Sequence, residues 1–126
     1  MAVRPNLTFW GVVLGTPNPR ALASFYEQLL GFERHSDDAD WATSLSSQGD
    51  RPGLSFQLED PYVPPVWPAG EGDQHMQMHL DIRVENVAAA GEFALSLGAT
   101  LADFQPQDDM RVYLDPDGHP FCFFVD

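Results

Sequence analysis

The chain has very little cysteine and no long apolar run, and both absences restrict what it can be. A single cysteine, Cys122, among 126 residues excludes an internal disulfide and fits a reducing compartment. The apolar runs are short, far from the roughly 20 residues that a membrane span needs. The first residues, Met-Ala-Val-Arg-Pro-Asn, lack the apolar core of a signal peptide. We therefore expect a cytoplasmic protein with no membrane partner.

Basic residues are also scarce. Six of them stand against 19 acidic residues, which gives a formal net charge of −13. A nucleic-acid or anionic-membrane surface needs clustered Lys and Arg, so we expect no nucleic-acid partner. The acidity indicates first a solvated, self-repelling surface, and attraction of a cationic ligand stays open as the functional alternative.

The first half of the chain contains a strand, a helix and two further strands in sequence order. Residues 9–14 are apolar and β-branched, as in a strand. Asn18-Pro19 then provides an N-cap with proline at the first helical position, and Gly31 is placed to end the helix. Two short strands are expected at 40–46 and 53–58. One apolar stripe at helical spacing supports the helix: Leu22, Phe25, Tyr26, Leu29 and Leu30.

The second half repeats this order. Residues 76–84 predict a strand, Glu85-Asn86 a helix start and Gly98 its end. Asp115-Pro116-Asp117-Gly118 predicts a turn between the last two strands. Three short strands are expected, at 100–104, 110–114 and 121–125.

The two halves align as copies of one unit. Gly11 matches His79 at a separation of 68 positions, and Gly31 matches Gly98 at 67. Each copy is too small to close a core alone, so the sequence predicts one domain, 1–126, of class α+β. Its tandem βαβββ modules are expected at about 5–58 and about 75–126, with a proline-rich linker at 59–74.

Three segments resemble the vicinal oxygen chelate superfamily of glyoxalases, extradiol dioxygenases and bleomycin-resistance proteins, with most similarity to its glyoxalase-like branch. These segments are Leu14 to Tyr26, His79 to Val84 and Asp115 to Cys122. The resemblance implies a curved mixed-sheet cup with helices on its convex side, and a homodimer. In the enzymes of the family, concave His, Gln or Glu side chains hold one divalent metal.

The residues at the family's ligand positions form an incomplete set of metal donors. Carried over one by one, these positions fall on Gly11, Gln57, His79 and Cys122, and glycine has no side chain to donate. We therefore expect no cofactor. The alternative is a Zn²⁺ or Fe²⁺ ion held by His79, Gln57 and Cys122.

The resemblance and period-two counting along the strands together predict the lining of the cup. Asp81 shares the face of His79. Its carboxylate either has a partner, which is His79 or a cationic or hydroxylated ligand, or is hydrated near the strand end. Trp41 and Phe56 are expected to serve the core first and the cleft second, while Trp10 should pack under the first helix. The expected ligand-binding set is Phe9, Gly11, Val13, Trp41, Phe56, Gln57, Trp67, His79, Asp81, Tyr113, Cys122 and Phe124.

A cup without its metal favours binding over catalysis. The sequence predicts a metal-independent small-molecule binding protein for an aromatic or drug-like ligand, as in antibiotic sequestration. One alternative is a metal-dependent lyase, isomerase or dioxygenase, and another is a structural module with an unused cleft. Cys122 as a nucleophile with His79 as its base is a weaker interpretation than a small buried apolar residue.

Overall fold

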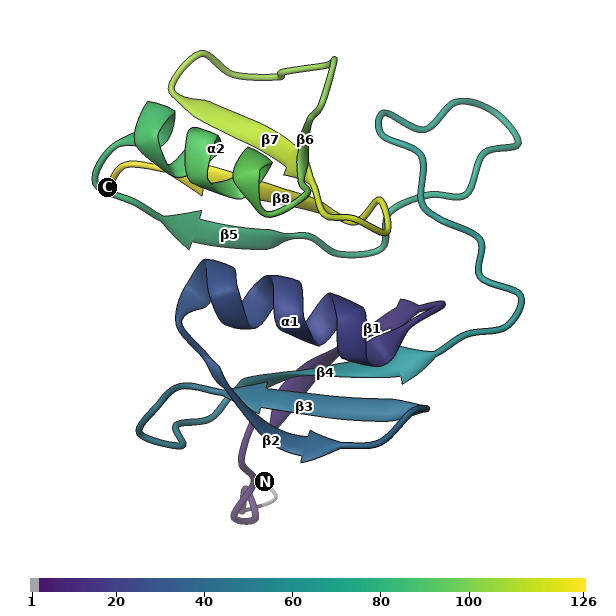
Figure 1. Ribbon diagram of the computed structural model, residues 1–126, viewed down its shortest axis with the longest axis vertical. Helices are drawn as coiled ribbons and strands as arrows, with labels where there is room; N and C mark the ends of the chain where they lie inside the picture. Colours follow the sequence, from purple (N-terminus) through teal and green to yellow (C-terminus); the bar gives the residue numbers. More distant parts are fainter. Residues whose placement is uncertain (1–2) are drawn as a thin grey trace. The chain divides into compact units, whose positions relative to one another are not determined.

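The computed structural model describes residues 3–126, which form two compact units, one ending at Glu59 and the other running from Asp60 to Asp126. Each unit contains one helix and a four-stranded mixed sheet (Figure 1). The sheet order is β1-β4-β3-β2 in the first unit and β5-β8-β7-β6 in the second. Because the same element order and sheet order occur twice, the α+β class and the duplicated βαβββ unit are confirmed.

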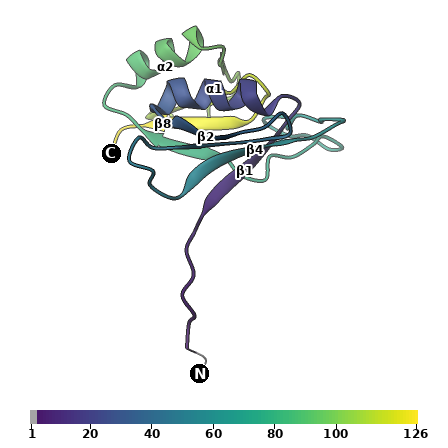
Figure 2. The ribbon, with the colours of Figure 1, turned by 60° about the horizontal axis from the view of Figure 1, so that its bottom comes forward.

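In the first unit, β1 (Gly11–Thr16) pairs in parallel with β4 (Gly53–Leu58). The antiparallel strands β3 (Trp41–Leu45) and β2 (Glu33–Asp37) complete the sheet. Helix α1 (Pro19–Leu30) covers one face of it (Figure 2). The face that α1 leaves uncovered carries alternate residues of each strand.

The second unit repeats this architecture. Strand β5 (Leu80–Arg83) pairs in parallel with β8 (Pro120–Phe124), and β7 (Met110–Leu114) and β6 (Thr100–Leu101) follow antiparallel. Helix α2 (Val87–Ser96) contacts β6, β7 and β8. The strand predicted at 76–84 is shorter in the structure, so His79 lies just before β5. No helix within residues 3–126 is long and apolar enough to span a bilayer.

Both helices begin at the predicted asparagines. The side chain of Asn18 accepts a hydrogen bond from the Ala21 amide at 3.2 Å, and Asn86 accepts one from Ala89 at 2.9 Å. Gly31 ends α1 with a φ of 74°, in the left-handed region that glycine adopts at low cost.

Replacing the first cap should weaken the first unit. We expect Asn18→Ala to lower the free energy of unfolding by about 1 kcal/mol, because one amide of the first turn loses its acceptor. Urea unfolding followed by circular dichroism measures this loss. Asn18→Ser keeps an oxygen acceptor and should stay close to wild type; an equal loss in both variants would contradict the capping role.

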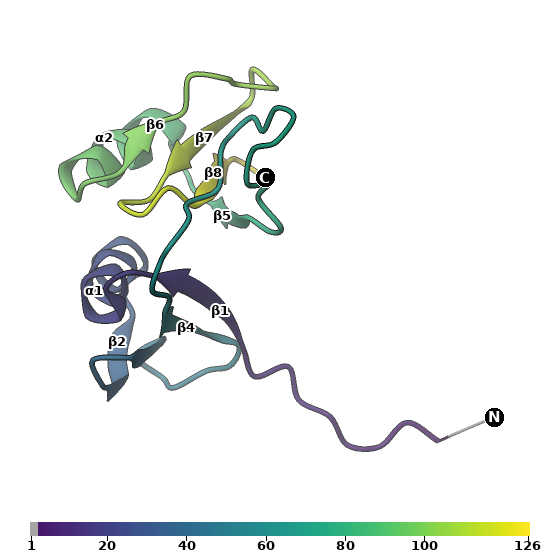
Figure 3. The same ribbon diagram turned by 90° about the vertical axis from the view of Figure 1, so that its right-hand side faces the viewer.

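Aromatic packing under the helices corrects three side-chain predictions. Phe56 is fully buried and stacks on Tyr26 of α1, with ring centroids 5.9 Å apart, so it lies on the helix side of its sheet and not in the cleft. Tyr113 likewise lies on the α2 side, where its hydroxyl approaches Gly91. Trp10 does not pack under α1: it is 63% exposed, and the Arg51 guanidinium lies 4.0 Å from its ring centroid. Residues 3–10, including Phe9, run outward ahead of β1 (Figure 3).

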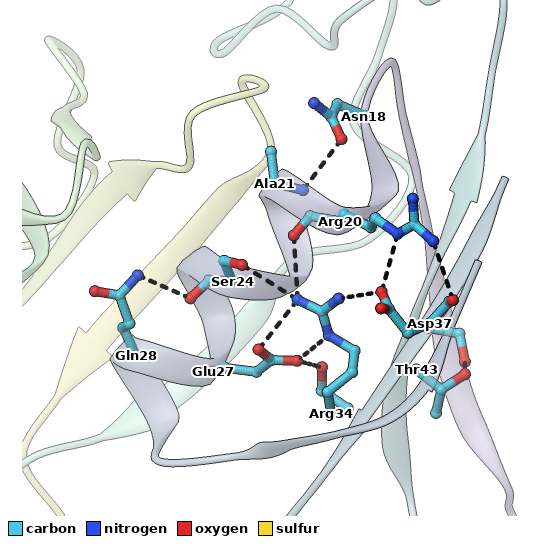
Figure 4. A network of polar contacts seen from close by, with 11 residues as sticks. Asn18, Arg20, Ala21, Ser24, Glu27, Gln28, Arg34, Asp37 and Thr43 are labelled. Atoms are coloured by element: carbon cyan, nitrogen blue, oxygen red, sulfur yellow. Dashed lines mark hydrogen bonds and ion pairs between the residues drawn. The ribbon is translucent and has the colours of Figure 1, made fainter. Parts of the chain in front are cut away.

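A polar cluster ties α1 to its sheet (Figure 4). The Arg34 guanidinium donates to both carboxylate oxygens of Glu27, at 2.5 and 3.2 Å, and to Asp37 at 2.7 Å. Ser44 of β3 also donates to Glu27, at 2.5 Å. Hydrogen bonds from Arg20 and Arg34 hold the pKa of Asp37 below its usual value. These two arginines are therefore committed to structure in the first unit.

Candidate functional site

A cavity of about 290 Å³ lies within the second unit. It opens on the sheet face opposite α2, because Tyr113, Phe121 and Phe123 occupy the other face. Most of its wall is apolar, and four polar side chains interrupt it. The lining residues are Trp67, Met76, His79, Asp81, Pro106, Gln107, Met110, Val112, Pro120 and Cys122.

Strand pairing positions the polar end of this cavity. Asp81 of β5 lies opposite Cys122 of β8, and Val112 of β7 lies opposite Cys122 on its other side. The three side chains therefore point from adjacent strands to one face. Cys122 and Val112 are buried with Ala102, and Trp67 and Met110 pack against this cluster.

Asp81 is the centre of a small polar group with His79 and Cys122. Its Oδ1 lies 3.1 Å from Nε2 of His79, and its carboxylate accepts a hydrogen bond from the Cys122 thiol. Burial, the charge of Asp81 and this hydrogen bond together raise the pKa of Cys122 to about 11. The thiol therefore stays protonated at neutral pH. Of the two interpretations of Asp81 from the sequence, the structure supports the one in which its carboxylate has a partner.

A second cavity, of about 270 Å³, adjoins the first and shares Asp81, Gln107 and Met110 with it. Asp109, Phe124 and Val125 complete its lining. The loop before β7 is held in place by Arg111, whose guanidinium donates to the carbonyls of Gln107, Asp108 and Met110. The carboxylate of Asp81 thus lies at the junction of the two cavities.

The proline-rich segment after Glu59 contributes the aromatic wall. Tyr62 donates through its hydroxyl to the carbonyl of Asp117 at 2.8 Å, which anchors the segment to the β7–β8 turn. Trp67 lies further along the same segment, with its ring centroid 6.1 Å from that of Phe104. Its Nε1 is buried and has no hydrogen-bond partner among the described residues, so packing holds the ring in place.

The remaining predicted residues belong to the first unit. Gln57 lies opposite Gly15 on one side and Trp41 on the other, and Gly11 and Val13 share that face by alternation along β1. Val13 and Trp41 are exposed there. The structure thus brings four predicted residues together on the uncovered face of this sheet, and four others, Trp67, His79, Asp81 and Cys122, around the cavity of the second unit.

The strand register also corrects the alignment of the two modules at one position. The N-caps Asn18 and Asn86 are 68 positions apart, so Val13 corresponds to Asp81. Because Val13 lies opposite Ser55 and Asp81 opposite Cys122, the first-unit counterpart of Cys122 is Ser55 and not Gln57. Ser55 is buried and lies 2.9 Å from the hydroxyl of Thr43.

Six cavity residues escaped the sequence prediction. Met110 and Val112 lie on the cavity face of β7, whereas Tyr113 lies on the opposite face. The prediction of Tyr113 as a lining residue is therefore wrong by one position along the strand. The pairing of Val112 with Cys122 is the signal that would have corrected it. Met76, Pro106, Gln107 and Pro120 lie in loops or at a strand end, where periodicity gives no signal.

The first-unit residues do not complete the ligand set that the resemblance implies. A Cβ at Gly11 would lie 2.9 Å from the Gly53 carbonyl oxygen, so the first ligand position has no room for a side chain without a shift. Gln57 is bonded through Nε2 to Glu59 at 2.8 Å.

In the second unit, one donor atom each from His79, Asp81 and Cys122 lies within 4.8 Å of the others. Donors on a shared zinc ion lie about 2.0–2.3 Å from it and about 3.5 Å from one another. The three side chains are therefore near enough to one another to be the candidate metal ligands of the second unit.

Comparison with known proteins identifies the fold. A family model described as a glyoxalase-like domain matches residues 11–124. A glyoxalase/bleomycin resistance protein/dioxygenase family enzyme from Burkholderia phytofirmans PsJN has a similar structure, with a TM-score of 0.69, 18% identity, and coverage of 93% of this chain and 97% of that one. A glyoxalase-related enzyme from Fulvimarina pelagi has a TM-score of 0.67 at 19% identity, over 94% and 88% of the two chains. At these identities the structural likeness concerns the fold alone, and no functionally curated protein matches the sequence.

Proposed function

The chain belongs to the glyoxalase-like domain family of the vicinal oxygen chelate superfamily, and from this premise we propose that it is a metal-independent small-molecule binding protein whose site is the cavity of the second unit. The observation that carries the proposal is an apolar cavity closed at one end by a hydrogen-bonded polar group. Such a cavity has the composition of a ligand pocket, in which apolar walls supply affinity and a few polar groups supply orientation.

The size and walls of the cavity favour a compact aromatic ligand. About 290 Å³ is at the lower end of small-molecule pockets, which suits one or two fused rings. The Trp67 ring offers a flat surface for stacking. Met76 and Met110 have flexible, polarisable side chains that adapt to ligands of different shape. These properties suit sequestration of aromatic or drug-like molecules.

The chemistry of Cys122 supports binding without a reaction. A nucleophilic cysteine works as a thiolate, and sites that activate it lower its pKa. Here the pKa is raised to about 11, and the neighbouring carboxylate accepts the thiol proton in a hydrogen bond. The group at the end of the cavity therefore presents an acceptor and two weakly acidic donors, which are recognition elements. The proposal includes a cytoplasmic location and a homodimer, the latter testable by sedimentation.

The binding prediction is tested with 2-naphthylmethanol, a neutral fused-ring probe of suitable size. We expect calorimetric binding that is unchanged by EDTA, and a loss of at least tenfold in affinity in Trp67→Ala because the aromatic wall is removed. Trp10→Ala, in the first unit, is the matched control and should bind as wild type.

Elemental analysis of untagged protein purified without chelator distinguishes the alternative. About one zinc or iron per chain, together with an activity lost on chelation, would contradict the proposal. That result would favour a metal-dependent lyase, isomerase or dioxygenase that uses the donors His79, Asp81 and Cys122. Absence of any binding to a panel of aromatic compounds would also contradict it.

A further inference from the structure

We infer that the polar end of the cavity binds a protonated amine, with the Asp81 carboxylate as the anchor and the aromatic part of the same ligand against Trp67. This inference rests on the proposed function and specifies the ligand class: an arylalkylamine whose ammonium group lies at the junction of the two cavities. The neutral aromatic compounds of the proposed function would bind in the same place but more weakly.

The negative charge of the chain is concentrated in the unit that holds the cavity. Residues 60–126 contain 12 acidic residues and two arginines, which gives a formal charge of −10 out of the total of −13. The chain has no lysine, so arginine and histidine are its basic side chains. A surface of one sign raises the local concentration of oppositely charged small molecules, and here that favours cations.

Neither arginine of the second unit is among the residues that line the two cavities. Arg111 is held by three backbone carbonyls, and Arg83, two residues beyond Asp81 on the same strand, is not part of the lining. Among the described residues, no arginine lines either cavity. His79 is the one lining group that can carry a positive charge beside Asp81, and its side chain is 40% exposed.

The Cys122 thiol leaves the charge of Asp81 in place. Burial, followed by the charge of Asp81, raises the pKa of this thiol to about 11, so at neutral pH it is an uncharged neighbour of the carboxylate. The Asp81 side chain is 58% exposed, so part of the carboxylate remains open to a further donor. An ammonium group supplies three donors and a full positive charge.

The arrangement of the two cavities determines the shape of the ligand. The first cavity is mostly apolar and has Trp67 in its wall, whereas the second adds another carboxylate, Asp109. Asp81 lines both. An aromatic ring in the first cavity with a one- or two-atom linker would place its ammonium group beside Asp81, facing Asp109.

The inference is tested with two probes of nearly equal size, 2-naphthylmethylamine and 2-naphthylmethanol, titrated calorimetrically at pH 7.5 and low salt. We expect the amine to bind about tenfold more tightly to the wild-type protein, as a partly solvated ion pair allows. In Asp81→Asn this preference should disappear while the alcohol still binds, which also shows that the variant is folded. Glu92→Gln removes an exposed charge on α2, away from the cavity lining, and should keep the preference.

The possible results separate the inference from the proposed function. Equal affinity of the two probes for the wild-type protein would overturn the inference and leave metal-independent binding standing. An amine preference that persists in Asp81→Asn would also overturn it, since the anchor would lie elsewhere. Failure of both probes to bind the wild-type protein would overturn both statements.

Discussion

Cys122 is expected to react with iodoacetamide about 100-fold more slowly at pH 7.5 than a cysteine in an unfolded chain. Its pKa of about 11, against an ordinary value of 9.0, reduces the thiolate population by that factor, and the thiolate is the reactive species. Burial of the side chain slows the reaction further, because the reagent has to reach the sulfur. The rate should rise about tenfold for each pH unit and level off near pH 11, since the protonated form is lost only there.

The measurement is direct because the chain has one cysteine, so mass spectrometry of the intact protein reports a single site. The same protein unfolded in urea provides the reference rate. Asp81→Asn removes the negative charge that helps to raise the pKa, and should speed the reaction. Modification at the rate of the unfolded chain would contradict the raised pKa, and a faster rate would indicate an activated thiol and support the nucleophile interpretation.

The second large effect is expected from Gly91→Ala, which should lower the free energy of unfolding by about 2 kcal/mol. A Cβ at Gly91 would lie 2.0 Å from the Tyr113 hydroxyl oxygen and 2.9 Å from its Cζ. Tyr113 has little room to move, because its ring is buried and lies 5.5 Å from that of Phe123. The sign of the change in the free energy of unfolding is the diagnostic result, because a glycine-to-alanine substitution inside a helix ordinarily stabilises the helix by up to about 1 kcal/mol.

Tyr113→Phe provides the test of this explanation. Removing the hydroxyl takes away the closest contact, so Gly91→Ala should cost about half as much in the Tyr113→Phe background. Ala89→Gly, at an exposed position of the same helix, should lose about 1 kcal/mol from helix propensity alone. Urea unfolding of the wild-type protein and these four variants measures the values. A stabilised Gly91→Ala variant would show that α2 does not pack against Tyr113 in this way.

The two predictions concern opposite faces of one sheet, because Cys122 lines the cavity and Gly91 of α2 packs against the other face. On the α2 side, aromatic rings fill the space so completely that a single methyl group is not accommodated. On the other side, the alternate residues of the same strands line a cavity. A strand side chain that moved from one face to the other would exchange a core role for a binding role.

Local sequence signals were sufficient to predict the duplicated architecture. Caps at Asn18 and Asn86, the glycine that ends α1 and the repeated element order are local signals, and each depends on residues a few positions apart. The resemblance then placed a family ligand position at Gly11, where no side chain exists. These predictions needed no knowledge of which remote segments lie side by side.

The position and the lining of the cavity depend instead on contacts between remote segments, which local signals do not encode. The pairing of β5 with β8 brings Asp81 to Cys122 across 41 positions, and a shift of one residue in that register would turn the whole set to the other face. The same alternation places Val112 on the cavity face of β7 and Tyr113 on the α2 face. Likewise, Pro106 and Gln107 reach the cavity through a loop whose course depends on contacts with Arg111, and loop geometry leaves no period in the sequence.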